Sequence, residues 1–244
     1  MTNTTNYWLS HFKANAQQLR INWDLNPAIS EKETEAVLSS LQAWQLAETG
    51  EGSNLLAASI KYAQKTGDPQ YVDAVKLFIK EEQKHGNNLG RYLDAINKPR
   101  IQKNWDDSLF RKVRHLNSNM EIWTITVIVI ESTAQLFYQA LKNATGCPLL
   151  KEICPDILID EAYHNTFQTE RLAIIYEDKS PFSKNWRITV YKYFFYATST
   201  LVYFAHRKLF KAGGLTFASY SKKMEYKYIK TVKMITDSPE MLWI

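Results

Sequence analysis

The feature that most constrains the fold of this chain is a pair of Glu-x-x-His motifs. They are Glu82 with His85 in "IKEEQKHGNN" and Glu161 with His164 in "ILIDEAYHNT", and corresponding residues are 79 positions apart (161 − 82 = 79). The turn sequences "TGDP" and "TGCP", which precede the motifs, are separated by the same 79 positions. A turn and a motif repeated in the same register indicate one helical hairpin that occurs twice. The sequence therefore predicts a four-helix bundle with approximate twofold symmetry.

The rest of the chain is also typical of long helices. Of its 244 residues, 45% are apolar and 23% are charged, as in soluble globular proteins. The seven prolines and eight glycines cluster between long uninterrupted stretches, which favours long helices over short strands. Ser30 followed by Glu33 is a capping-box signal for a helix start. We expect helices over residues 31–65, 69–95, 117–143, 148–175 and 183–211, with a short amphipathic segment at 4–20, a short helix within 105–116 and a last basic helix near the C-terminus.

Charge divides the chain into two parts. Residues 1–178 contain 18 Lys and Arg against 22 acids, a net charge of −4, and residues 179–244 contain 12 against 3, a net charge of +9. We expect the first part to hold an N-terminal helix and the bundle, and the second to form basic, aromatic-rich helices packed on it. Its apolar stretch at 193–205 is shorter than the roughly 20 residues that span a bilayer. A solvated helix face is the first interpretation of the positive charge, and peripheral contact with a membrane or an acidic partner is a less favoured alternative.

Cysteine content and the first residues bear on the cellular compartment. Cys147 and Cys154 are too few for a disulfide framework or a four-thiolate metal site. The opening "MTNTTNYWLS" lacks the apolar run of a signal peptide. A cytoplasmic protein is therefore expected.

The spacing of the motifs predicts a metal site. Residues three positions apart share a helix face, so the Glu and His of each motif can bind one object. Glu131 lies fourteen residues before Thr145, and Glu161 lies thirteen after Pro148, so both reach nearly the same level along two antiparallel helices. Glu131 stands in the apolar run "VIVIESTAQLF", where a carboxylate is costly unless it is paired or binds metal.

The corresponding carboxylate of the first hairpin is less well defined. Glu51 lies fifteen residues before Thr66, one position from the register of Glu131. Glu48 is closer in angle but about 6 Å too far along a regular helix. The flanking Gly50 and Gly52 indicate a local irregularity. We favour Glu51 as the ligand, with Glu48 as an alternate or supporting carboxylate.

Four carboxylates and two imidazoles suit two iron or manganese ions, because the mixed set disfavours calcium and the lack of thiolates disfavours structural zinc. At this point residues 31–175 resemble the ferritin-like superfamily, in which two helices each give a Glu and two others each give Glu-x-x-His. In relatives with Asp-Glu-x-x-His the Asp orients a histidine of the opposite motif. The resemblance therefore implies that Asp160 holds His85, and Glu81 is a candidate to hold His164 in the same way. The expected metal ligands are Glu51, Glu82, His85, Glu131, Glu161 and His164, with Glu48, Glu81 and Asp160 as alternate or supporting residues.

The resemblance implies a reaction class but not a substrate. Two iron ions, or manganese or a mixed Mn/Fe pair, would support an oxidoreductase that activates O₂ or peroxide on a small or lipid-like substrate, with an electron donor still to be identified. The alternative is an iron-binding or ferroxidase protein, storage or not, without an organic substrate. The chain lacks the Cys-x-x-Cys pairs of a fused rubredoxin, which argues against a rubrerythrin-like peroxidase. The connection "NKPRIQKNWDDSLF" between the second and third bundle helices, and the roughly sixty-five residues that follow the bundle, favour the oxidoreductase over a cage ferritin. A homodimer is compatible with the resemblance, and no nucleic-acid partner is expected. Tyr138 and Tyr163 are candidates for a phenol near the metals, although core packing is the commoner role of such residues.

Overall fold

The structure is a computed structural model that describes residues 4–103 and 119–236. Within these ranges the regular structure is helical and contains no strand. The expected short helix within residues 105–116 lies outside the described residues. The helices are α1 (Thr5–Asn15), α2 (Glu31–Glu48), α3 (Ser53–Thr66), α4 (Gln70–Ala95), α6 (Met120–Ala144), α7 (Pro148–Glu177), α8 (Pro181–Ala205), α9 (Arg207–Ala212) and α10 (Phe217–Thr236).

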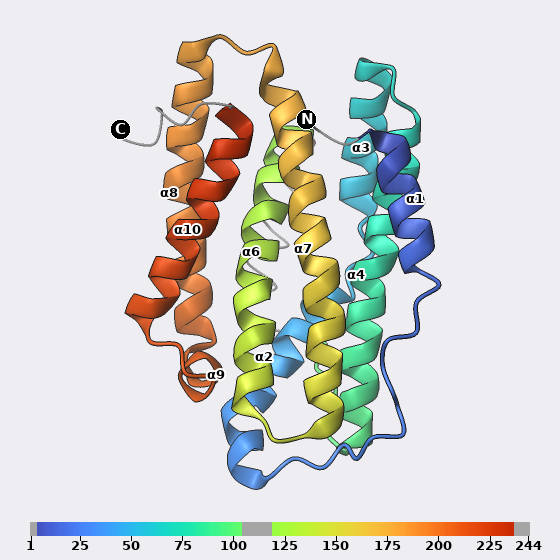
Figure 1. Ribbon diagram of the computed structural model, residues 1–244, viewed down its shortest axis with the longest axis vertical. Helices are drawn as coiled ribbons and strands as arrows, with labels where there is room; N and C mark the ends of the chain where they lie inside the picture. Colours follow the sequence, from blue (N-terminus) through green and yellow to red (C-terminus); the bar gives the residue numbers. More distant parts are fainter. Residues whose placement is uncertain (1–3, 104–118, 237–244) are drawn as a thin grey trace.

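The central layers form the expected four-helix bundle. α6 and α7 make an antiparallel hairpin, α4 packs against α7, and α2 with α3 packs against α4 and α6 (Figure 1). α1 lies against α4 at one side of the bundle. The prediction of an all-α bundle made from two hairpins, with an added N-terminal helix and added C-terminal helices, is confirmed.

Local sequence signals explain where the helices begin and end. The Ser30 hydroxyl accepts a hydrogen bond from the backbone N–H of Glu33, and the Glu33 carboxylate accepts one from the backbone N–H of Ser30. This capping box starts α2 as predicted. Gly67 ends α3 with φ +70°, a left-handed conformation that favours glycine, and Pro148 starts α7 at a position that requires no N–H donor.

The predicted helix over residues 31–65 is wrong in one respect, because it is two helices. α2 ends at Glu48 and α3 begins at Ser53. Gly52 has φ +65°, and a Cβ at this position would lie 2.7 Å from Cδ1 of Ile79 on α4. The chain therefore needs glycine here both for its left-handed backbone and for its close approach to α4. The predicted helix over 183–211 is likewise divided into α8 and α9 at His206.

The C-terminal helices pack on the bundle through aromatic side chains. α8, α9 and α10 lie together on the side of the bundle opposite α1 and α3 (Figure 1). The rings of Tyr191 and Phe195 on α8 lie 5.5 and 5.6 Å from that of Tyr228 on α10. Phe210 on α9 contacts Phe137 on α6. One hydrophobic core therefore extends from the bundle into the C-terminal helices.

α6 is the most apolar helix of the described chain. By length and composition it could cross a membrane, but 67% of its most apolar window is buried inside the protein. A buried core helix can have the same length and apolar composition as a membrane-spanning helix. The position of α6 at the centre of the bundle fits a core helix.

Candidate metal centre

Six side chains from four helices meet at the centre of the bundle. α4 supplies Glu82 and His85, and α7 supplies Glu161 and His164, because each motif places both side chains on the same helix face. α6 supplies Glu131. The sixth residue, Glu48, is the last residue of α2.

These residues form two overlapping groups, each of which could hold one ion. The first contains Glu48, Glu82, His85 and Glu161, and the second contains Glu82, Glu131, Glu161 and His164. Within each group one ligand atom per residue lies within 4.8 Å of all the others. Glu82 and Glu161 belong to both groups, so either carboxylate could serve as a ligand to both ions.

Five polar atoms that face the centre are buried without a well-aligned hydrogen bond within the described chain: His85 Nδ1, His164 Nδ1, Glu82 Oε1 and both carboxylate oxygens of Glu161. They lie against one another, with 2.8 Å between His164 Nδ1 and Glu82 Oε1 and 3.6 Å between His85 Nδ1 and Glu161 Oε1. Burying such atoms without a partner costs about 1–3 kcal/mol each, and more for charged groups. Two divalent cations would satisfy all five atoms with oxygen and nitrogen ligands that suit iron or manganese. The residues present therefore fit a two-metal centre.

The outer nitrogen of each imidazole is held by a carboxylate of the other motif. His85 Nε2 lies 3.1 Å from Asp160 Oδ2, and His164 Nε2 lies 2.9 Å from Glu81 Oε2. These contacts fix the rings so that each Nδ1 faces the centre, as in many protein metal sites. The structure places Asp160 and Glu81 where the sequence analysis expected them. The Asn15 side-chain amide donates to both carboxylates, at 2.6 Å to Glu81 and 2.9 Å to Asp160.

Positive side chains surround the outer carboxylates. Arg20 pairs with Asp160 and, at 2.5 Å, with Asp156, and Lys84 Nζ lies 3.2 Å from Asp160. Burial alone would raise the pKa of Asp160, but the hydrogen bond and charge of His85, together with Lys84, hold that pKa well below its usual value. Asp160 is therefore an ionised acceptor for the imidazole.

The carboxylates that face the centre repel one another. Burial and then the charges of Glu82 and Glu131 raise the pKa of Glu48 well above its usual value. Burial and then Glu82 raise the pKa of Glu131 to about 7, and burial and then Glu131 raise that of Glu161 well above its usual value. Burial would lower the pKa of His164, but Glu82 and Glu81 hold it well above the usual value. Without cations, the centre therefore takes up protons to reduce its excess negative charge.

The structure corrects the choice between the two carboxylates of the first hairpin. Glu48 lies in the cluster, whereas Glu51 is exposed in the break between α2 and α3 and belongs to neither group. The sequence-based register counted residues from Thr66 along one regular helix, and the break at 49–52 invalidates that count. Glu48 accepts hydrogen bonds from Trp44 Nε1 at 2.9 Å and from the Tyr138 hydroxyl at 2.8 Å.

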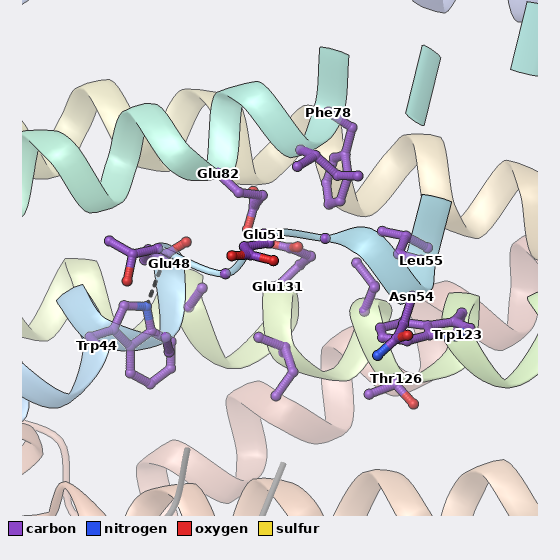
Figure 2. A pocket seen from close by; sticks show the side chains of 18 of the residues that line it. Trp44, Glu48, Glu51, Asn54, Leu55, Phe78, Glu82, Trp123, Thr126 and Glu131 are labelled. Carbon is purple, nitrogen blue, oxygen red and sulfur yellow. Dashed lines mark hydrogen bonds between the residues drawn. The ribbon is translucent and has the colours of Figure 1, made fainter. Parts of the chain in front are cut away.

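A cavity of about 510 Å³ reaches the centre from one side. Glu48 lies on the left of it and Glu82 and Glu131 near the middle, and Asn54 and Trp123 lie on the right (Figure 2). Most of the remaining wall is apolar, and it contains no Lys or Arg among the described residues. The apolar wall residues are Ala43, Trp44, Ala47, Leu55, Phe78, Ile79, Val127, Ile130, Ala134, Leu201, Val202 and Ala205.

Two tyrosines were candidates for a phenol near the metals. Tyr138 is fully buried and donates to Glu48, so it is in direct contact with the centre. Tyr163 is 40% exposed and packs against His11, 4.1 Å between ring centroids. Sequence reasoning missed Asn15 and Arg20, because neither belongs to a motif and their contacts bridge more than 60 positions.

Comparison with known proteins agrees with the fold. The structure resembles solved structures of an R2-like ligand-binding oxidase. It superposes on a variant with an aerobically reconstituted Mn/Fe cofactor at a TM-score of 0.64 with 14% identity, covering 97% of this chain and 95% of that one. Another variant, with an anaerobically reconstituted Mn/Fe cofactor, gives a TM-score of 0.63 at 14% identity and the same coverage. No protein-family model and no curated protein matches the sequence. At this identity the likeness establishes the fold, which confirms the predicted ferritin-like architecture.

Proposed function

We propose that this protein is a two-metal oxidoreductase that activates O₂ or peroxide and acts on a small or lipid-like apolar substrate. The observation that carries the proposal is the junction between the centre and the cavity. Three of the carboxylates, Glu48, Glu82 and Glu131, line a largely apolar cavity whose volume is in the range of ligand sites. A largely apolar cavity beside the centre favours an organic substrate over iron storage.

The chain's own residues define where the ions would bind. One ion would be held by Glu48, Glu82, His85 and Glu161, and the other by Glu82, Glu131, Glu161 and His164. A pair of redox-active iron ions, or a Mn/Fe pair as named for the similar structures, supplies electrons and Lewis acidity for reactions with oxygen.

The protein's contribution is position, proton balance and exclusion of water. The Asp160 and Glu81 carboxylates orient the imidazoles, and the Tyr138 hydroxyl positions Glu48. The Glu82 side chain is 22% exposed, toward the cavity, whereas Glu161 is fully buried, so a substrate approaches the Glu82 side of the centre. The lack of cationic residues in the described wall favours an uncharged or metal-directed polar group on an otherwise apolar molecule.

Metal analysis combined with ligand extraction tests the proposal. Protein expressed with iron and manganese should contain about two ions per chain, and anaerobically loaded protein should consume O₂. Glu161→Gln should lose both ions, because this carboxylate belongs to both groups. Glu51→Gln is the matched control: it changes an exposed carboxylate of the same cavity and should keep the ions.

Mass spectrometry of a solvent extract should reveal a bound apolar molecule. Its amount should fall when Leu201→Arg, a variant of the cavity wall, places a charge among the apolar residues. A protein that takes up neither metal would refute the proposal. Accumulation of many irons per chain in a large shell would establish the storage alternative instead.

A further inference from the structure

A line of exposed aromatic side chains runs along α8. Phe182, Trp186 and Tyr193 are 83%, 63% and 71% exposed. Trp186 and Tyr193 lie four and eleven residues after Phe182, which places all three on one side of the helix. Phe204, 22 residues after Phe182 and 54% exposed, extends this line to about 33 Å. Large apolar side chains are costly to leave in water, and several of them aligned on one side of a helix indicate an interaction site.

The line is separate from the faces that α8 uses for packing. Tyr191 and Phe195 are buried against α10, and Leu201 with Val202 lines the cavity from another side. The core of the protein is therefore complete without the exposed rings. Their exposure is a property of the surface and not an unfilled part of the core.

The surroundings of the aromatic line are strongly basic. Residues 179–236 contain twelve Lys and Arg and one acid, Glu225, a net charge of +11 (12 − 1). The exposed side of α10 carries Tyr226, which is 69% exposed, among four lysines. Phe204 contacts Phe217 at the start of α10, with 5.3 Å between ring centroids, so the two helices form one continuous surface. The exposed lysines of this surface on α10 are Lys222, Lys223, Lys230 and Lys233.

We propose that this surface of α8 and α10 docks the protein on a bilayer that contains anionic lipids. The aromatic side chains would enter the boundary between headgroups and acyl chains, and the lysines would lie at the phosphate level. Charge complementarity selects this occupant. A second copy of the chain would bring two lysine-rich surfaces against each other, which is repulsive. A bilayer also accepts protruding rings without a matching pocket, which a folded acidic partner would have to provide.

Vesicle binding of the full-length chain tests the proposal. Sedimentation is measured with phosphatidylcholine vesicles and with vesicles that also contain 30% phosphatidylglycerol. Binding is expected to the anionic vesicles and not to the neutral ones, and it should weaken as salt is raised. Quenching of tryptophan fluorescence by lipids brominated in the acyl chains should be lost when Trp186 is replaced by Ser.

Variants separate the contributions of the rings and of the charges. Phe182→Ser with Trp186→Ser should weaken binding at least about tenfold. Lys222→Glu with Lys223→Glu should weaken it by about fivefold or more for each lysine, since each is worth roughly 1 kcal/mol at such a surface. Matched controls lie outside the surface: Leu19→Ser, 98% exposed, and Lys61→Glu on α3 should bind as the unchanged protein does. Circular dichroism confirms that each variant is folded.

Several outcomes would overturn the proposal. These are equal binding to both kinds of vesicle, no binding to either, and equal effects of the control and surface variants. Concentration-dependent dimers abolished by Trp186→Ser, with no vesicle binding, would show that the surface joins two copies instead. The docking surface is separate from the metal centre, so the two can be tested independently. Glu82→Gln should reduce metal content and leave vesicle binding unchanged.

Discussion

Gly86 on α4 tests how the end of α2 is positioned at the centre. It follows His85 directly, and its missing side chain lets α2 approach α4. A Cβ at Gly86 would lie 2.8 Å from Thr49 Cγ2, 3.1 Å from the carbonyl carbon of Glu48 and 3.1 Å from the backbone nitrogen of Thr49. Two of these atoms are backbone, so a side-chain rotation cannot relieve the contact. Gly86→Ala should therefore push the end of α2, and Glu48 with it, away from the centre.

Two opposing effects determine how much Gly86→Ala changes the unfolding free energy. Replacing a glycine inside a helix with alanine stabilises by about 1 kcal/mol through backbone propensity. Forcing an extra methyl group into a packed contact costs about 1–3 kcal/mol. Gly90→Ala, one turn later on α4, is the matched control, because the three atoms nearest to its new Cβ all belong to the guanidinium end of Arg100, which can move. The two variants should therefore differ by about 1–3 kcal/mol, or about 2–12 °C in melting temperature for a chain of this size.

Thermal and urea denaturation of both metal-free variants measure the difference in stability. Metal titration then measures the consequence at the centre. Gly86→Ala should weaken binding of the ion held by Glu48, Glu82, His85 and Glu161, while the other ion is retained. Gly90→Ala should bind both ions as the unchanged protein does. Equal stability and equal metal content in the two variants would refute the argument that the absence of a side chain at Gly86 positions Glu48.

The remaining predictions concern three buried groups. Tyr138→Phe removes the hydrogen bond to Glu48 and should lower the unfolding free energy by about 0.5–1.5 kcal/mol in urea denaturation; unchanged stability would contradict it. Asp160→Asn should weaken metal affinity about 10–100-fold in titrations, since Asp160 orients His85. The folded state lowers the pKa of Asp160, so the ionised carboxylate stabilises the fold above its unfolded pKa near 4, and this stabilisation is lost as pH falls further. The Asp160→Asn variant should therefore lose less stability than the unchanged protein between pH 5 and 3. Burial lowers the pKa of His206 to about 4, below its unfolded value of 6.5, so its contribution is present above pH 6.5 and declines toward pH 4. About 2 kcal/mol should be lost from this group between pH 7 and 5, and His206→Gln should have a correspondingly flatter profile; parallel profiles would argue against it.

The part of the site that sequence reasoning could predict is local. Glu82 with His85, and Glu161 with His164, each lie within one helical turn, so their shared face depends only on helix geometry. α4 and α7 are both unbroken through their motifs, and α7 continues even through Pro155. The 79-residue repeat therefore carried over directly into the structure.

The first-helix carboxylate shows where this reasoning stops. The register predicted for Glu51 assumed a constant rise and rotation from Thr66 back along the chain. Gly50 and Gly52 did indicate an irregularity, but not whether it was a bulge or a complete break. The left-handed backbone at Gly52 lies so close to Ile79 on α4 that no side chain fits there, a contact that no local pattern in the sequence reports.

The outer contacts and the C-terminal surface were beyond sequence reasoning for a different reason. Asn15 reaches Glu81 and Asp160 from an N-terminal segment without a motif. In α8, aromatic residues occupy several sides of the helix at once, so periodicity could not separate the buried Phe195 from the exposed Tyr193. Which ring is covered depends on how α8 packs against α10, and this is a tertiary property.

The break between α2 and α3 explains why two similar hairpins form an asymmetric centre. In the second hairpin, α6 runs without interruption through Glu131. In the first, α2 stops at Glu48, and the irregular residues 49–52 line the cavity next to the carboxylates. The same departure from helical geometry therefore sets the position of Glu48 and forms part of the cavity wall beside it. Because the irregularity depends on glycine, the approach to the metal centre is built into one half of the repeat, and the other half keeps a regular helix that closes the core.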